Sequence, residues 1–191
     1  MERKGHLIAL LTIFIWGNTF VSTKTLLASF TPVEILFFRF TLGFIALLLA
    51  YPHRLKLTNR IQELYFIAAG LTGVTLYFLF ENIALTYTFA SNVGVLVATT
   101  PLFTAIIARI FLKEALKPQF FVGFAIAISG IAMISFNGAS VLKLNPLGDI
   151  LAIGASLLWA VYSVIVKKIS SYGYNSIQIT RRIFFYGLVL M

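Results

Sequence analysis

Long apolar segments constrain the fold of this sequence more than any other feature. A helix that crosses the hydrocarbon core of a bilayer needs about 20 mostly apolar residues. We place such segments at residues 7–27, 32–51, 64–86, 89–112, 118–136 and 147–168, with a seventh beginning at 176–191. A transmembrane barrel would show alternating hydrophobicity in segments of about ten residues, whereas runs such as FVGFAIAISGIAMIS are apolar throughout. The sequence therefore predicts an all-α membrane protein, a polytopic bundle of transmembrane helices.

The composition agrees with a location in lipid. Hydrophobic residues make up 60% of the chain and charged residues 11%, whereas a soluble domain carries about 25% charged residues. Lys and Arg outnumber Asp and Glu by 15 to 6, but they are dispersed between apolar segments rather than clustered, so we expect no nucleic-acid binding. The absence of cysteine excludes disulfides and Cys-based metal sites.

The distribution of Lys and Arg predicts the orientation, because short cytoplasmic loops are enriched in them. A cytoplasmic N-terminus leaves only Lys24 and Lys143 in the outer segments. It places the following on the inner side: Arg3, Lys4, Arg54, Lys56, Arg60, Arg109, Lys113, Lys117, Lys167 and Lys168. The basic, apolar start also resembles a secretory signal, but no small-residue cleavage site follows it. We therefore expect a multi-pass protein of the plasma (bacterial inner) membrane with its N-terminus in the cytoplasm.

A weak internal repeat is visible when the chain is displaced by 143 residues. This displacement superposes Trp16 on Trp159, Lys24 on Lys167 and Arg39 on Arg182. Five predicted spans separate the two starts, so the second copy enters the membrane from the opposite side. Inverted repeats of this kind build many secondary transporters, in which exchange of the two conformations gives alternating access.

The repeat divides the chain into two expected domains, a first five-helix repeat at residues 1–140 and the start of a second at 141–191. A second unit of equal length would end near residue 279, on the order of ninety residues beyond Met191. We therefore expect about seven spans of a ten-span protein, and hence a truncated sequence or fragment.

Several short motifs carry a family resemblance. They are Trp16, PVEILFFR at 32–39, ALTYTFA at 84–90, Pro101, LKEAL at 112–116 and Gly123. In their order and spacing they resemble the EamA-type family of the drug/metabolite transporter superfamily. The resemblance implies two five-helix repeats and export or exchange of a small metabolite, such as an amino acid or a related compound, through a central cavity. One departure is that Ile177 stands at the position equivalent to Glu34.

Two aromatic pairs are the first candidates for lining such a cavity. Trp16 shares a helix face with Thr19, and its repeat mate Trp159 shares one with Tyr162. An aromatic ring beside a hydroxyl can hold the apolar part of a solute and hydrogen-bond its polar head. The alternative, anchoring in the interfacial aromatic belt, fits less well because both tryptophans fall near mid-span.

Ionisable residues within spans are the next candidates, because they are costly in lipid and usually face a cavity or a partner. Arg39 and its repeat mate Arg182 lie within predicted helices, and Arg39 either pairs with Glu81 across helices or extends toward the headgroups. Tyr77 and Glu81 share one face of the third span, where we expect them to line the cavity. Glu81 is the candidate for a proton-linked carboxyl group.

Small and polar residues complete the set. We expect Gly70 and Gly73 to allow close helix packing and Pro101 to kink the fourth span. Asn92 and Thr99 share a face. They either contact solute or bond to neighbouring helices.

No pattern of catalytic residues supports an enzyme. His6 and His53 flank different spans, and the sequence has no Walker loop, nucleophile elbow or HExxH motif, so we expect no cofactor and no metal. The predicted partners are the lipid bilayer and a small-molecule solute, with a homodimer left open. The alternative function is a non-transporting membrane interaction subunit or an inert truncated product.

Overall fold

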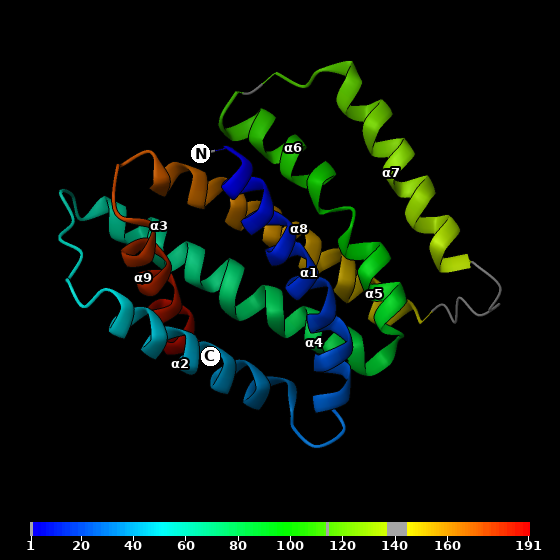
Figure 1. Ribbon diagram of the computed structural model, residues 1–191, viewed down its shortest axis with the longest axis horizontal. Helices are drawn as coiled ribbons and strands as arrows, with labels where there is room; N and C mark the ends of the chain where they lie inside the picture. The colour runs from blue at the N-terminus through cyan, green and yellow to red at the C-terminus, as the bar shows by residue number, and fades with distance from the viewer. Residues whose placement is uncertain (1, 114, 137–144) are drawn as a thin grey trace.

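The computed structural model describes residues 2–113, 115–136 and 145–191 (Figure 1). Within these ranges the chain is helical and has no strand. The helices are α1 (Glu2–Leu26), α2 (Pro32–Ala50), α3 (Ile61–Gly70), α4 (Tyr77–Tyr87), α5 (Ala90–Val97), α6 (Thr100–Phe111), α7 (Pro118–Phe136), α8 (Pro146–Ser170) and α9 (Ser176–Val189), with a π-helical turn η1 (Leu71–Leu76). The predicted domain boundary at 140/141, Glu114 of the LKEAL motif and Lys143 lie outside the described ranges.

Helices long and apolar enough to cross a membrane account for most of the chain. Over the described residues, five such segments are found, namely Gly5–Leu26, Pro32–Ala50, Ile61–Tyr87, Ala90–Phe111 and Pro146–Ser170. The other two predicted spans correspond to α7 and α9. Large apolar side chains on α1 and α2 are exposed, as expected where a surface meets lipid. The predicted polytopic bundle of transmembrane helices is confirmed.

The helix ends follow from local sequence. The α2 helix begins with a capping box, in which the Glu34 carboxylate accepts hydrogen bonds from the backbone N–H and the hydroxyl of Thr31, both at 2.8 Å. Asn145 and Asn175 cap α8 and α9 through their side-chain oxygens. These caps satisfy backbone donors that a helix start leaves free. Glu34 thus caps α2 together with Thr31, whereas Ile177, at the position matched to it by the 143-residue displacement, lies in a helix that Asn175 caps.

The third span is not a uniform helix. The π-helical turn η1 interrupts it between α3 and α4, where two glycines admit neighbouring helices. A Cβ at Gly70 would lie 2.8 Å from the backbone nitrogen of Gly187 in α9, and one at Gly73 would lie 2.2 Å from the ring of Tyr162 in α8. The Thr75 hydroxyl in this turn donates to the carbonyl of Gly187 at 3.0 Å. The predicted packing role of both glycines is confirmed.

The fourth span is broken into α5 and α6 around Ala98 and Thr99. Pro101 stands at the start of α6, where its missing backbone N–H costs no helical hydrogen bond. The interruption of the helix directly before Pro101 confirms the expected kink in this span.

Helix α8 holds the bundle together. It packs against α3, α4, α5, α6 and η1, while α9 packs against α2 and α3. The buried face of α8 carries Ala152, Ala155, Ser156 and Ala160, and such small residues let helix backbones approach closely. Figure 1 shows α7 at the edge of the bundle opposite α2.

Helices α1 and α8 run in opposite directions. Lys24, near the C-terminal end of α1, donates to the carbonyl of Thr88 at 3.1 Å. Gly148, near the N-terminal end of α8, packs against the same Thr88. Opposite directions are what an inverted repeat requires; the repeat itself stays a prediction.

Candidate functional site

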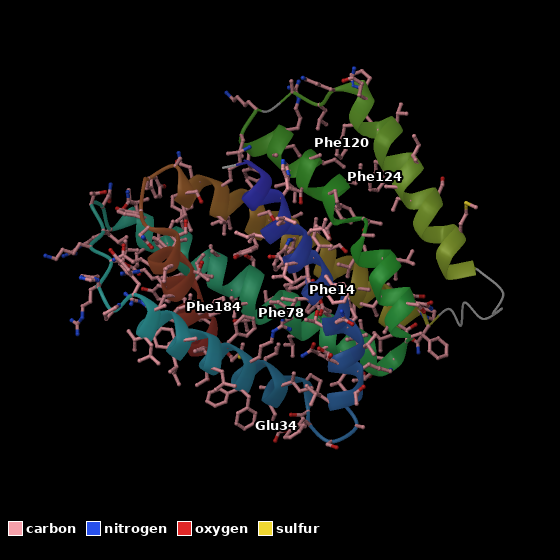
Figure 2. All side chains as sticks on the ribbon, viewed as in Figure 1. Phe14, Glu34, Phe78, Phe120, Phe124 and Phe184 are labelled. Carbon is pink, nitrogen blue, oxygen red and sulfur yellow. The ribbon has the colours of Figure 1, made fainter. Side chains whose placement is uncertain are left out.

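A cavity of about 650 Å³ lies among α1, α4, α5, α6, α7 and α8. Its wall is mostly apolar, and the hydroxyls of Thr100 and Thr104 add polar groups. The lining residues are Ile13, Trp16, Gly17, Phe20, Tyr77, Gly94, Val97, Ala98, Thr100, Pro101, Thr104, Ala105, Ala108, Phe120 and Trp159. Figure 2 shows Phe120 and Phe124 in the space between α7 and α6. The volume lies within the range of about 300–1,000 Å³ that small-molecule sites occupy.

Aromatic rings in mutual contact form one side of this cavity. The ring centroids of Trp16 and Trp159 are 5.6 Å apart, and the ring of Tyr77 is 4.6 Å from that of Trp159. Tyr162 lies 4.9 Å from Trp159 and fills the space that Gly73 leaves open. Tyr162 therefore supports Trp159 rather than lining the cavity.

Buried polar groups lie beside the aromatic wall on α4. Glu81 is 1% exposed, and Tyr77 and Asn82 are fully buried. Among the described residues, the Tyr77 hydroxyl, one Glu81 carboxylate oxygen and the Asn82 side-chain carbonyl have no hydrogen-bond partner. A buried polar group without a partner is costly, and active sites are a common reason for retaining one.

Arg39 does not form the contact ion pair that was one of its two expected arrangements. The described residues contain no salt bridge between Arg39 and Glu81 within 4.0 Å. The guanidinium carbon instead lies 4.5 Å from the ring centroid of Phe78, where the negative face of the ring attracts the cation. The expected pairing with Glu81 is corrected accordingly, because α4 presents Phe78 to Arg39.

Arg39 and Thr19 line a second cavity, of about 530 Å³, and not the cavity that the tryptophans line. The second cavity lies between α1 and α2, and it is lined by Thr19, Ser22, Thr23, Leu26, Phe30, Ile35, Phe38 and Arg39. The Thr19 hydroxyl donates to the carbonyl of Trp16 at 2.6 Å. The face shared by Trp16 and Thr19 is thus divided between two neighbouring cavities.

Three other predicted residues lie away from the tryptophan cavity. The Asn92 amide donates to the hydroxyl of Thr88 at 3.2 Å, and the Thr99 hydroxyl donates to the carbonyl of Leu96 at 2.6 Å. Arg182 pairs with Glu63, its Nε donating to a carboxylate oxygen at 2.8 Å. These contacts are the kind expected of helix-bonding polar residues.

The sequence interpretation missed a stripe of small residues that forms the opposite wall. Its members are spaced three or four apart along α5 and α6, and they are Gly94, Ala98, Pro101, Ala105 and Ala108. This spacing places them on one side of the span, and it was available as a signal in the sequence. Among the described residues, no group of three or more His, Asp or Glu side chains gathers to hold a metal.

Comparison with known proteins decides the family. A model described as the EamA-like transporter family matches residues 3–136, which is more than half of the chain. The chain belongs to the EamA-like transporter family. It is 31% identical to an uncharacterized transporter of Archaeoglobus fulgidus over 88% of the chain, and 31% identical to one of Clostridium kluyveri over 99%. It is also 32% identical to the uncharacterized inner membrane transporter YedA of Escherichia coli over 87% of the chain.

This EamA-like chain spans 59%, 64% and 53% of the length of these three relatives, respectively. No solved structure matches it significantly. The family and the apolar helices together identify a multi-pass membrane protein.

Proposed function

We propose that the protein is a secondary transporter that exports or exchanges a small metabolite, such as an amino acid or a related compound, by alternating access. The observation that carries this proposal is the 650 Å³ cavity in which Trp16 and Trp159 meet. Its volume suits a solute of this size. Membership of the EamA-like family gives the class of activity.

The chemistry of the wall suits an amphipathic solute. The indole rings of Trp16 and Trp159 bind an apolar side chain, and the Thr104 hydroxyl offers a hydrogen bond to a polar head. The Thr100 hydroxyl donates to the carbonyl of Val97 at 2.6 Å and can accept a hydrogen bond from the solute. Because the aromatic rings and the small-residue stripe come from different spans, a change in their separation opens or closes the space between them.

The mechanism assigned to this cavity rests on two opposed halves, residues 1–140 and the unit beginning at 141. Each half contributes one tryptophan, on α1 and on α8, and these helices run in opposite directions. Rocking of one half against the other exposes the site to alternate sides of the membrane. In this proposal the N-terminus is cytoplasmic, as the distribution of Lys and Arg predicts.

Glu81 is the group proposed to couple transport to protons. Its carboxyl group is almost fully buried, and one oxygen lacks a hydrogen-bond partner among the described residues. A carboxyl group within a span marks a proton or ion pathway by default. Tyr77, one turn earlier on the same helix face, places this group beside the cavity wall.

Efflux from cells preloaded with a mixture of radiolabelled amino acids tests the proposal. We expect Trp159→Ala to reduce efflux at least tenfold, a loss of about 1.4 kcal/mol of solute binding or transition-state stabilisation. Phe14→Ala is the control, because Phe14 is also an aromatic residue within a span but is 69% exposed and does not line the cavity. Glu81→Gln should abolish the dependence of efflux on the proton gradient.

The alternative is a non-transporting interaction subunit. It is supported if the wild-type chain is present in the membrane but shows no efflux above that of cells without it. Cross-linking in membranes tests separately whether two copies of the chain form a homodimer.

A further inference from the structure

A third cavity, of about 260 Å³, lies at the end of the bundle that carries the α2–α3 linker. It shares no residue with the two cavities described above. We call it the arginine cavity, and it is lined by Phe44, Arg54, Leu55, Gln178, Arg181, Arg182, Phe185 and Tyr186. Three arginines thus line one small space beside two phenylalanines.

Arg181 carries a buried charge that no acidic side chain balances in the described part of the chain. It is 8% exposed, and its guanidinium donates to the backbone carbonyls of Tyr51 and His53. A guanidinium has five N–H donors, and these two contacts use only part of that capacity. Carbonyl dipoles alone are a poor substitute for a counter-ion, because a buried charge without one is costly.

The neighbouring arginines do not relieve this excess of positive charge. Arg182 is already neutralised by Glu63, which accepts from its Nε at 2.8 Å and also forms a salt bridge with its Nη2. Arg54 is exposed on the linker and adds a further positive charge. The described lining therefore favours an anion, and arginine pairs with phosphate oxygens through two parallel hydrogen bonds.

The apolar part of the lining narrows the class of anion. The rings of Phe44 and Phe185 are 6.4 Å apart, and Phe185 is 48% exposed. Arg181 lies five residues into α9, about 8 Å along the helix axis from its first residue, so the cavity lies near the end of a helix rather than at its middle. An amphipathic anion fits this combination of cationic and aromatic groups, and basic pockets between helices at a membrane boundary bind anionic lipid headgroups.

We propose that the arginine cavity binds the phosphate of an anionic glycerophospholipid, with Arg181 and Arg54 contacting the phosphate and Phe44 and Phe185 contacting the acyl chains. Arg181 belongs to α9 and Arg54 to the α2–α3 linker, so a phosphate bound by both connects these two elements. It would reinforce the bonds that Arg181 and Gln178 of α9 already make to the carbonyl of His53 in that linker. This site is independent of the transport proposed above.

The test compares thermal unfolding of the purified full chain in nanodiscs of phosphatidylcholine alone and in nanodiscs that also contain phosphatidylglycerol. We expect phosphatidylglycerol to raise the unfolding temperature of the wild type, and Arg54→Gln to reduce this shift by at least half. Arg181→Gln should lower the affinity for phosphatidylglycerol about tenfold or more, as expected for loss of a charge-assisted hydrogen bond.

Arg60→Gln is the matched control, because Arg60 is an exposed arginine of the same linker that does not line the cavity. It should keep the full shift. If Arg181→Gln does not fold, the proposal is tested by comparing the phosphatidylglycerol-induced shifts in unfolding temperature of Arg54→Gln and Arg60→Gln. Equal unfolding temperatures of the wild type in the two lipids, or equal shifts in Arg54→Gln and Arg60→Gln, would overturn the proposal.

Glycerol phosphate added to phosphatidylcholine nanodiscs distinguishes a lipid from a soluble phosphate. Stabilisation equal to that by phosphatidylglycerol would overturn the lipid assignment. The readout is unfolding temperature rather than efflux, so failure here leaves the proposed transport untouched.

Discussion

Gly73 shows how a single residue determines the cavity wall. It leaves room for the Tyr162 ring, and that ring in turn supports Trp159 at 4.9 Å. Any side chain at position 73 therefore displaces the ring that holds a cavity tryptophan in place.

We expect Gly73→Ala to destabilise the protein by about 1–3 kcal/mol, the usual cost of overpacking a filled site. Its Cβ would lie 2.2 Å from the Tyr162 ring. Thermal unfolding in detergent measures the loss, and Gly130→Ala is the control because no atom lies within 4 Å of its added Cβ. A double variant with Tyr162→Ala should show non-additive losses, since it removes the clash; additive losses would contradict this explanation.

Individual residues were predictable to different degrees. The tryptophans could be singled out from the sequence because a displacement of 143 residues superposes them, and both line one cavity. Thr19 could not be assigned in the same way, because helical periodicity gives a shared face but not where a neighbouring helix divides it. The contact of Arg39 with Phe78 depends on how two helices meet, which spacing along one helix does not specify.

Lys24 links two helices at their ends. Its ammonium group donates to the carbonyls of Leu85 and Thr88 at the C-terminal end of α4. The last carbonyls of a helix have no partner within it and carry the negative end of the helix dipole. Lys24 therefore satisfies α4 while fixing α1 beside it.

We expect Lys24→Met to lower the free energy of unfolding by about 1.5–3 kcal/mol, the range for hydrogen bonds to a charged group. Lys24→Arg should retain part of the contact. Lys117→Met is the control, because Lys117 is exposed on the α6–α7 linker. Equal effects of Lys24→Met and Lys117→Met, measured by thermal unfolding, would exclude this role.

The positions of the helices were predictable, but their internal irregularities were only partly so. Proline chemistry predicted the break between α5 and α6. The π-helical turn η1 was not predicted, because it forms where Gly187 and Tyr162 pack against it from helices far along the chain. The helix propensities of residues Leu71–Leu76 do not depend on those contacts, so the local sequence could not predict the turn.

Because α1 and α8 run in opposite directions, their C-terminal ends lie at opposite ends of the bundle. Ser29 follows α1, and Ser171 follows α8. Both side chains are exposed, and the chain has no cysteine of its own. A cysteine introduced at either position is therefore the single thiol of the chain, and no native cysteine contributes to the labelling.

We expect a membrane-impermeant maleimide to label Ser29→Cys on intact cells and to label Ser171→Cys only after permeabilisation. The positive-inside distribution predicts this direction. The reverse pattern would invert the topology, and labelling of both from outside would refute the opposed arrangement of α1 and α8.

The meeting of Trp16 with Trp159 also gives the molecule a natural optical reporter. These are the two tryptophans of the chain, and both line the same cavity at a centroid separation of 5.6 Å. Indole emission from the unlabelled chain therefore originates at one place, and the coupled rings should give a near-ultraviolet circular dichroism band that neither ring gives alone. A solute entering between them would change both signals, so candidate compounds can be screened by titration before any flux is measured.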